Sequence, residues 1–166
     1  MYRNIQDFIK DWQNENDSTL KVFTNLTDVS LNQKVTPDGR SLGFLAWHIT
    51  ITLGEMGEKA GLKVDAPAEY SPVPIHASDI VAAYKKAGIS IASTVEERWN
   101  DSMLLELIDM YGEKWTRSAT LGSLVKHQIH HRAQMTVLMR QAGLKVPGIY
   151  GPSREEWSQF GMPAPQ

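Results

Sequence analysis

Apolar residues recur at intervals of three and four along most of this chain, the spacing that places them on one face of an α-helix. Between residues 5 and 26, charged and amide residues fill the gaps in this pattern. The apolar positions of this first segment are Ile5, Phe8, Ile9, Trp12, Leu20, Phe23 and Leu26. They predict an amphipathic helix of about seven turns.

Turn-forming and capping residues bound a second helix. The segment TPDGR is typical of a turn, and Ser41 follows it as an N-cap. We predict a helix from Ser41 to about Ala60, ended by Gly61. Residues 61–77 contain three prolines and few periodic apolar positions, which indicates a long irregular crossover rather than a tight hairpin.

A third helix is predicted to begin at an N-cap, Ser78. Its apolar stripe consists of Val81, Tyr84, Ile91, Val95 and Trp99. Residues 101–118 carry weaker signals, which indicate a short helix followed by an extended turn around Gly112.

The fourth helix has the clearest pattern and is predicted from about Thr120. Its stripe consists of Leu124, His127, His131, Met135 and Leu138. Arg140 and Gly143 mark its end. Further along, Ser153 and Glu156 have the spacing of a capping box for one or two helical turns.

Four long amphipathic helices with two extended connections predict an all-α fold, a four-helix bundle. The chain has 166 residues, the length of one ordinary domain, and no internal repeat or linker interrupts it. We therefore expect a single domain over residues 1–166.

Composition narrows the classes of function. The chain carries 17 basic and 19 acidic residues and no basic run with interleaved aromatics, so we do not expect a nucleic-acid partner. It has no cysteine, which excludes disulfides, thiolate metal ligands and a cysteine nucleophile. We find no signal peptide and no apolar run of about 18 residues, so we expect no membrane contact and a cytoplasmic location.

The histidines of HQIHHRAQ carry the most informative chemistry. His127 and His131 stand four residues apart on an apolar helical stripe, so both imidazoles are expected to point into the bundle. His48, in FLAWHIT, lies on a second apolar helix and can face this pair. His130 lies about 100° around the helix from His131, so we expect it at the surface or behind the ligands.

Three converging imidazoles suit a borderline divalent ion such as Zn²⁺, Ni²⁺, Co²⁺ or Fe²⁺, whereas Ca²⁺ and Mg²⁺ prefer oxygen ligands. Three protein ligands also leave coordination positions for water or substrate. A water bound there has a pKa near 7, and a thiol can be held as its anion. The alternative interpretation, hydrogen-bonded core histidines without a metal, stays open at this point.

Other residues near the stripes have functional and structural interpretations. Glu55 lies seven residues after His48 and is a fourth ligand, a general base or part of an exposed ion pair. Tyr84 offers a phenol to the site or packs in the core, and Gln134 can orient a ligand from outside the coordination shell. Gln128 stands where the zinc-peptidase motif HExxH requires Glu, which excludes that class. We expect core positions for the tryptophans Trp12, Trp47, Trp99, Trp115 and Trp157.

The segments SLGFLAWHIT and LGSLVKHQIHHRAQMTVLMRQAGLKVPGIYG resemble the DinB family, within the wider DinB/YfiT-like group of proposed metalloenzymes. The resemblance covers most of the chain. It implies a four-helix bundle of up-down-down-up topology, usually a homodimer, with a divalent ion, Zn or Ni, held by His48, His127 and His131. Ala133 stands where relatives often carry Gly, and Gln128 where many carry Glu, but neither change removes a ligand.

Characterised members of this group include thiol-dependent S-transferases and isomerases. The resemblance therefore implies a metal-dependent enzyme that activates a low-molecular-weight thiol for attack on a small-molecule substrate. Two alternatives remain, a metal-dependent hydrolase and a non-catalytic, dimeric bundle that binds a metal or a small ligand.

Overall fold

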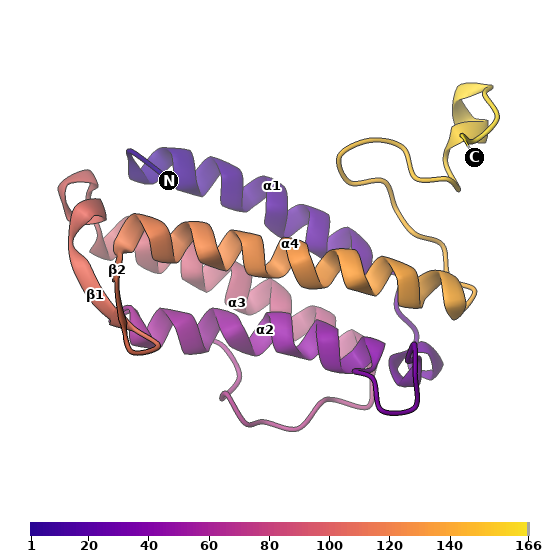
Figure 1. Cartoon of the computed structure of the whole chain (residues 1–166), viewed down its shortest axis with the longest axis horizontal. Coiled ribbons are helices and arrows are strands. Elements are labelled where there is room, and N and C mark those ends of the chain that lie inside the picture. Colours follow the sequence, from indigo (N-terminus) through magenta and orange to yellow (C-terminus); the bar gives the residue numbers. More distant parts are fainter. Residues whose placement is uncertain (166) are drawn as a thin grey trace.

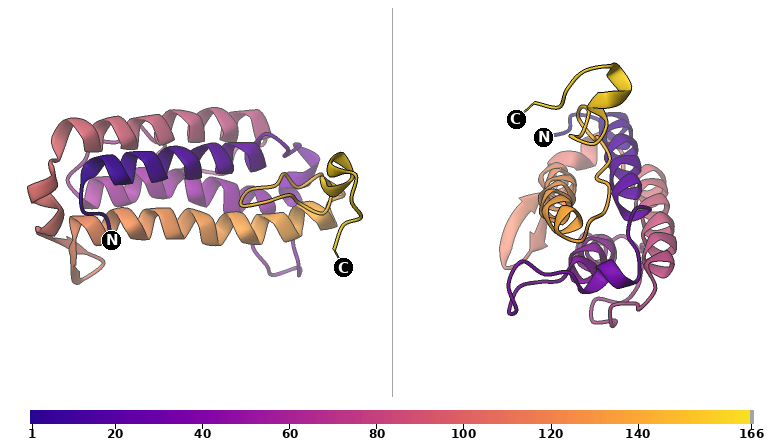
Figure 2. Two further views of the ribbon diagram at one scale, coloured as in Figure 1. Left: turned by 90° about the horizontal axis from the view of Figure 1, so that it is seen from above. Right: turned by 90° about the vertical axis from the view of Figure 1, so that its right-hand side faces the viewer.

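Four long helices lie side by side in the computed structural model, which describes residues 1–165 (Figure 1). The helices are α1 (Ile5–Phe23), α2 (Leu42–Lys59), α3 (Ala77–Arg98) and α4 (Arg117–Gln141). Helix α1 packs against α3 and α4, and α2 packs against the same two neighbours. In the end-on view of Figure 2 the four helices therefore occupy the corners of a square.

The direction of the helices confirms the up-down-down-up topology. Helices α1 and α4 run one way, while α2 and α3 run the other way (Figure 1). Because α2 and α3 are parallel neighbours, the chain must return along the bundle between them. Residues 60–76 make this return without a helix or strand, as predicted for the crossover.

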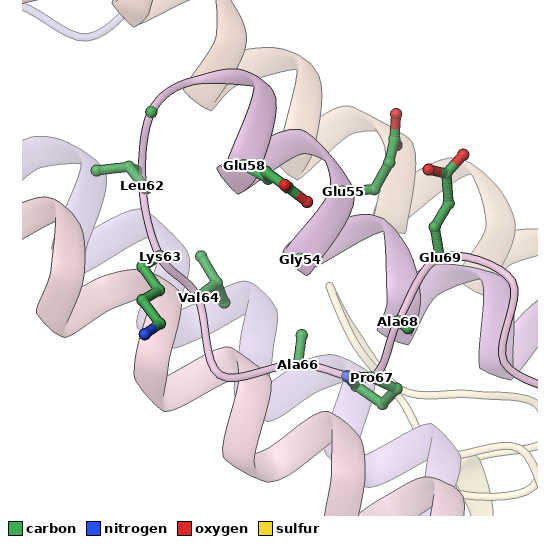
Figure 3. Close-up of a pocket in the computed structure, with 11 residues that line it drawn as sticks. Gly54, Glu55, Glu58, Leu62, Lys63, Val64, Ala66, Pro67, Ala68 and Glu69 are labelled. Atoms are coloured by element: carbon green, nitrogen blue, oxygen red, sulfur yellow. The ribbon is translucent and has the colours of Figure 1, made fainter.

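The crossover lies close against α2 because two glycines leave room for it (Figure 3). A Cβ atom at Gly57 would come within 2.5 Å of the Val64 side chain, and one at Gly54 within 2.9 Å of Ala66. Larger residues at these positions would push the crossover away from the helix.

The ends of α2 and α4 follow local signals. The Ser41 side chain accepts a hydrogen bond from the Phe44 N–H at 3.1 Å, which confirms it as the N-cap of α2. Gly61 and Gly143, with φ of +77° and +73°, follow the two helices as predicted. Helix α4 begins at Arg117, earlier than the pattern indicated, because the Thr116 hydroxyl caps it.

The predicted ends of α1 and α3 were wrong. Helix α1 stops at Phe23, and Leu26 lies in the loop that follows. Its side chain is buried, so an apolar residue at this spacing indicated burial but not a continuation of the helix. Helix α3 begins at Ala77 rather than after a Ser78 cap. The cap is supplied from a distance, since Asp28 Oδ1 accepts the Ala77 N–H at 2.8 Å.

The connection between α3 and α4 contains a β-hairpin that the sequence pattern did not reveal. A short 3₁₀ helix, η2 (Asp101–Leu105), precedes strands β1 (Leu107–Met110) and β2 (Glu113–Thr116), which pair antiparallel. Tyr111 and Gly112 form the turn with φ of +54° and +83°. Two positive φ values suit a tight hairpin, so the turn predicted around Gly112 is confirmed.

The C-terminal segment forms half of the predicted capping box. The Glu156 carboxylate accepts the Ser153 N–H at 3.1 Å and the Gly148 N–H at 2.9 Å. The Ser153 hydroxyl makes no reciprocal bond. A short 3₁₀ helix, η3 (Trp157–Phe160), follows where helical turns were expected.

The core lies between the four helices and holds Trp12, Trp47 and Trp99 as predicted. Trp115 and Trp157 were expected there too, but both are partly exposed, Trp115 on strand β2 and Trp157 in the C-terminal segment. No helix within residues 1–165 is long and apolar enough to cross a membrane.

Candidate metal centre

Three histidines meet where α2 and α4 pack together. His48 lies on α2, and His127 and His131 lie one turn apart on the facing side of α4. The centroids of the three rings are 4.5 to 4.8 Å apart in pairs. One nitrogen from each ring lies within 4.8 Å of the other two, so the group can hold a metal ion.

The three rings differ in their access to solvent. His131 is buried, with 6% of its surface exposed, whereas His48 and His127 are half-buried. The Nε2 atoms of His48 and His127 lie 2.9 Å apart, within reach of a hydrogen bond in which one ring donates. The cluster is therefore closed on the core side and accessible at its outer edge.

The surroundings keep these imidazoles uncharged at neutral pH. Burial, reinforced by His131 and Arg40, lowers the pKa of His48 to about 4. Burial and the neighbouring histidines lower the pKa of His127 to about 3, and burial also lowers the pKa of His131. Neutral imidazole is the form that binds metals, so protons compete for these nitrogens only in acid.

Gln134 fixes the orientation of His131, as one interpretation of the sequence proposed. Its Oε1 atom lies 2.8 Å from His131 Nδ1, and its Nε2 atom lies 3.2 Å from His130 Nε2. With Nδ1–H donating to the amide, the Nε2 lone pair of His131 is left for an ion.

Replacing Gln134 with Leu is expected to weaken metal binding by about 10- to 100-fold, because His131 loses the acceptor that fixes its tautomer. Gln134→Glu keeps an acceptor at this position and is expected to lose much less. Competition against a chelating dye measures both dissociation constants. Equal affinity of Gln134→Leu and the wild type would contradict the orienting role.

His130 stays outside the cluster, as predicted. Its side chain is exposed, and its ring centroid lies 4.9 Å from that of His131. Of the neighbouring histidines on α4, only His127 and His131 contribute to the group that can hold an ion.

Glu55 is not a member of this group, and the ion-pair interpretation fits it best. Its side chain is 14% exposed and lies 3.6 Å from Lys59 Nζ, one turn further along α2. The Tyr111 hydroxyl donates a hydrogen bond to its Oε2 atom at 2.9 Å. Tyr111 belongs to the hairpin. Because the sequence did not predict the hairpin, it did not predict this contact with Glu55 either.

Tyr84 and Gln128 belong to the core and not to the histidine cluster. The Tyr84 hydroxyl donates to Gln128 Oε1 at 2.7 Å, and both side chains are fully buried. Of the two interpretations of Tyr84, the core position is confirmed, because its side chain is fully buried and its hydroxyl is bonded to Gln128. Gln128, which stands at the glutamate position of HExxH, is therefore a neutral side chain bonded to Tyr84 in the core.

A pocket of about 540 Å³ adjoins the cluster between α2, α4 and the hairpin. His48 and His127 form part of its wall, together with Glu55, Tyr111 and Trp115. A separate pocket of about 510 Å³, drawn in Figure 3, lies between α2 and the crossover and includes none of the three histidines. The pocket of about 540 Å³ is therefore the one that a molecule bound beside His48 and His127 would occupy.

The lowered pKa values predict an acid-sensitive metal-free protein. Histidines in the unfolded chain have a pKa near 6.5, whereas His48 and His127 have pKa values of about 4 and about 3 in the folded protein. As the pH falls below 6.5 the unfolded chain binds protons that the folded chain does not, so stability falls. Thermal unfolding between pH 7.5 and 4.5 is expected to show a shallower decline for His48→Gln/His127→Gln. Identical slopes would contradict the lowered values.

Known proteins resemble this chain over nearly its full length. The model of the DinB family matches residues 1–164. An uncharacterized protein, YrdA of Bacillus subtilis strain 168, is 43% identical over 166 residues, which covers 100% of this chain and 99% of YrdA.

Solved structures show the same fold. A DinB-like protein from Bacillus cereus ATCC 10987 has a TM-score of 0.87 at 40% identity, over 90% of this chain and 100% of that protein. The DinB-like protein YjoA of Bacillus subtilis has a TM-score of 0.68 at 17% identity, over 89% and 99% of the two chains, a likeness of fold alone. From the family match and these relatives, this chain belongs to the DinB family.

Proposed function

We propose that this protein is a divalent-metal-dependent enzyme whose ion is held by His48, His127 and His131, and that it transfers a small thiol to an electrophilic substrate. The observation that carries the proposal is the convergence of three imidazoles within 4.8 Å between α2 and α4. An all-nitrogen donor set favours Zn²⁺ or Ni²⁺ over the oxygen-preferring Ca²⁺ and Mg²⁺.

The donor set fits such an ion. The lowered pKa values leave all three rings neutral, and Gln134 leaves His131 Nε2 free to coordinate. Three protein ligands leave at least one position for an exogenous group. When bound, the ion would lower the pKa of a thiol at that position and favour its anion.

Electrostatics support an anionic partner at the cluster. The positive charge of Arg40 helps to lower the pKa of all three histidines, and no carboxylate within residues 1–165 raises these pKa values comparably. The guanidinium lies 5.2 Å from the centroid of the Phe44 ring, which stacks on His48. Arg40 would therefore stabilise a thiolate that approaches from this side.

The attacking sulfur must come from outside the protein, because the chain has no cysteine. In the proposed reaction the thiol loses its proton to solvent and its sulfur bonds to the electrophilic carbon. The leaving group then departs with the electron pair of the broken bond. Hydrolysis is less well supported, because Glu55 is engaged by Lys59 and Tyr111 and Gln128 is buried in the core.

The proposal includes the setting of the enzyme. We propose one domain over residues 1–166, a homodimer that acts on small molecules in the cytoplasm. The family match over residues 1–164 supports the single domain. The net charge of −2 supports a small-molecule partner rather than nucleic acid or an anionic membrane surface. Light scattering after size-exclusion chromatography tests the dimer.

Thiol dependence tests the reaction. Chlorodinitrobenzene is offered to the Zn²⁺- or Ni²⁺-loaded protein with a panel of small thiols, and its thioether product is measured. We expect turnover that needs both thiol and metal and that His131→Ala abolishes. Turnover of a nitrophenyl ester without added thiol would instead favour the hydrolase. If neither chlorodinitrobenzene nor the ester reacts under any of these conditions, the enzymatic proposal fails and a metal- or ligand-binding bundle remains.

A further inference from the structure

The pocket beside the three histidines has two chemically different walls. Its volume of about 540 Å³ lies in the range of small-molecule sites. One wall comes from α2 and the hairpin, and the other comes from α4. His48 and His127 stand where the walls meet the proposed metal site.

The wall formed by α2 and the hairpin offers apolar surface. Met56, Tyr111 and Trp115 line it. The polar tips of the two aromatic residues are already bonded, since Tyr111 OH donates to Glu55 at 2.9 Å and Trp115 Nε1–H to Glu113 at 2.7 Å. The two rings pack edge to face with centroids 5.9 Å apart. Lys59 Nζ lies over the Tyr111 ring, 5.5 Å from its centroid. The carbon face of Trp115 is therefore the aromatic surface left for a ligand, and its bonded tip keeps the entropic cost of binding small.

The α4 wall offers polar groups that are free to bind. His130 also lines this wall, but its Nε2 atom is already paired with Gln134 Nε2 at 3.2 Å. Ser123 and Lys126 line the pocket and lie three residues apart, on the same side of α4. Within residues 1–165 neither side chain makes a hydrogen bond or an ion pair. The other polar side chains of the α2 wall are occupied, because Glu55 pairs with Lys59 and Thr52 Oγ1 donates to the His48 carbonyl at 2.7 Å.

We infer that this pocket binds a substrate with a flat apolar body and an anionic group. The body lies against Met56 and Trp115, and the anion is bound by Lys126 with a hydrogen bond from Ser123. The inference rests on the proposed function, because the pocket is assigned to substrate through the wall that it shares with His48 and His127.

Two probes with the same body separate these contributions. Phenylbutyrate carries a carboxylate and phenylbutanol a hydroxyl, and titration calorimetry on the metal-free protein measures the Kd of each. We expect phenylbutyrate to bind about three- to tenfold more tightly, the range for a solvent-exposed ion pair. Lys126→Gln should remove this difference and leave phenylbutanol binding unchanged. Lys10→Gln, at an exposed position of α1, is the matched control and should change neither Kd.

Variants of the two walls test whether the apolar body of the ligand binds in this pocket. Trp115→Leu should weaken both probes by a similar factor, about tenfold, because it removes apolar contact area and not charge. Ser123→Phe fills the pocket from a different element and should block both probes, so the test does not depend on one variant folding.

The pocket assignment can be tested separately from the proposed metal site. His131→Ala should lose metal yet keep phenylbutyrate binding in the metal-free protein, since His131 is not part of the pocket wall. Equal affinities of the two probes, or a preference for the acid that survives Lys126→Gln, would overturn the anion assignment. Probe binding that is unaffected by both Trp115→Leu and Ser123→Phe would overturn the pocket itself.

Discussion

Replacing Arg132 with Met is expected to lower the free energy of unfolding by about 3–5 kcal/mol, because it leaves a buried carboxylate without its counter-charge. The side chains of Arg132 and Glu15 are only 3% and 8% exposed, and Arg132 Nη2 lies 2.6 Å from Glu15 Oε2. Arg132 also donates to the Glu15 carbonyl at 3.0 Å and to Thr19 Oγ1 at 3.1 Å. These bonds join α1 to α4.

Urea unfolding of two further variants makes this test specific. Arg140→Met breaks a more exposed pair, with Glu155 at 3.1 Å, and should cost only about 0–1 kcal/mol. Arg132→Met/Glu15→Leu removes both buried charges and should recover much of the loss, since no unpaired charge remains. Similar losses for Arg132→Met and Arg140→Met would show that burial does not govern the energy of the pair.

Single replacement of His48, His127 or His131 with Ala is expected to reduce bound metal to less than about a tenth of an equivalent. An ion that binds only the folded protein raises its stability, by about 4 kcal/mol at a concentration a thousand times the Kd. Each variant should therefore lose the rise in Tm that Zn²⁺ or Ni²⁺ produces in the wild type. Elemental analysis and thermal unfolding with and without metal measure both effects.

His130→Ala is the matched control for this series. His130 lies on the same helix beside His131 but outside the group of converging nitrogens, so its removal should leave metal content and the metal-induced rise in Tm unchanged. Equal loss of metal from His130→Ala would contradict the assignment of ligands to one face of α4.

Local periodicity explains why the histidine cluster could be predicted. His127 and His131 share a face through their spacing alone, and the apolar residues on the same stripe turn that face inward. His48 sits on the apolar face of α2, so packing α2 against α4 brings the three rings together. The bundle and the cluster therefore follow from signals within single helices.

The features that were missed depend on contacts between distant segments. The hairpin strands are only four residues each, too short for a clear alternation, and Tyr111 adopts a positive φ that few non-glycine residues take. Its hydroxyl meets Glu55, 56 residues earlier, and Arg132 meets Glu15, 117 residues earlier. No pattern within a single helix encodes such pairs. The wall that the hairpin contributes to the pocket could therefore be identified only from the structure.

The metal content of the wild-type protein tests the central claim most directly. The protein is purified without an affinity tag, incubated with Zn²⁺ or Ni²⁺, desalted and analysed for metal per chain. Three neutral imidazoles with a fixed tautomer at His131 predict about one ion per chain. Less than about a tenth of an equivalent after reconstitution would contradict the metal site, and with it the proposed reaction.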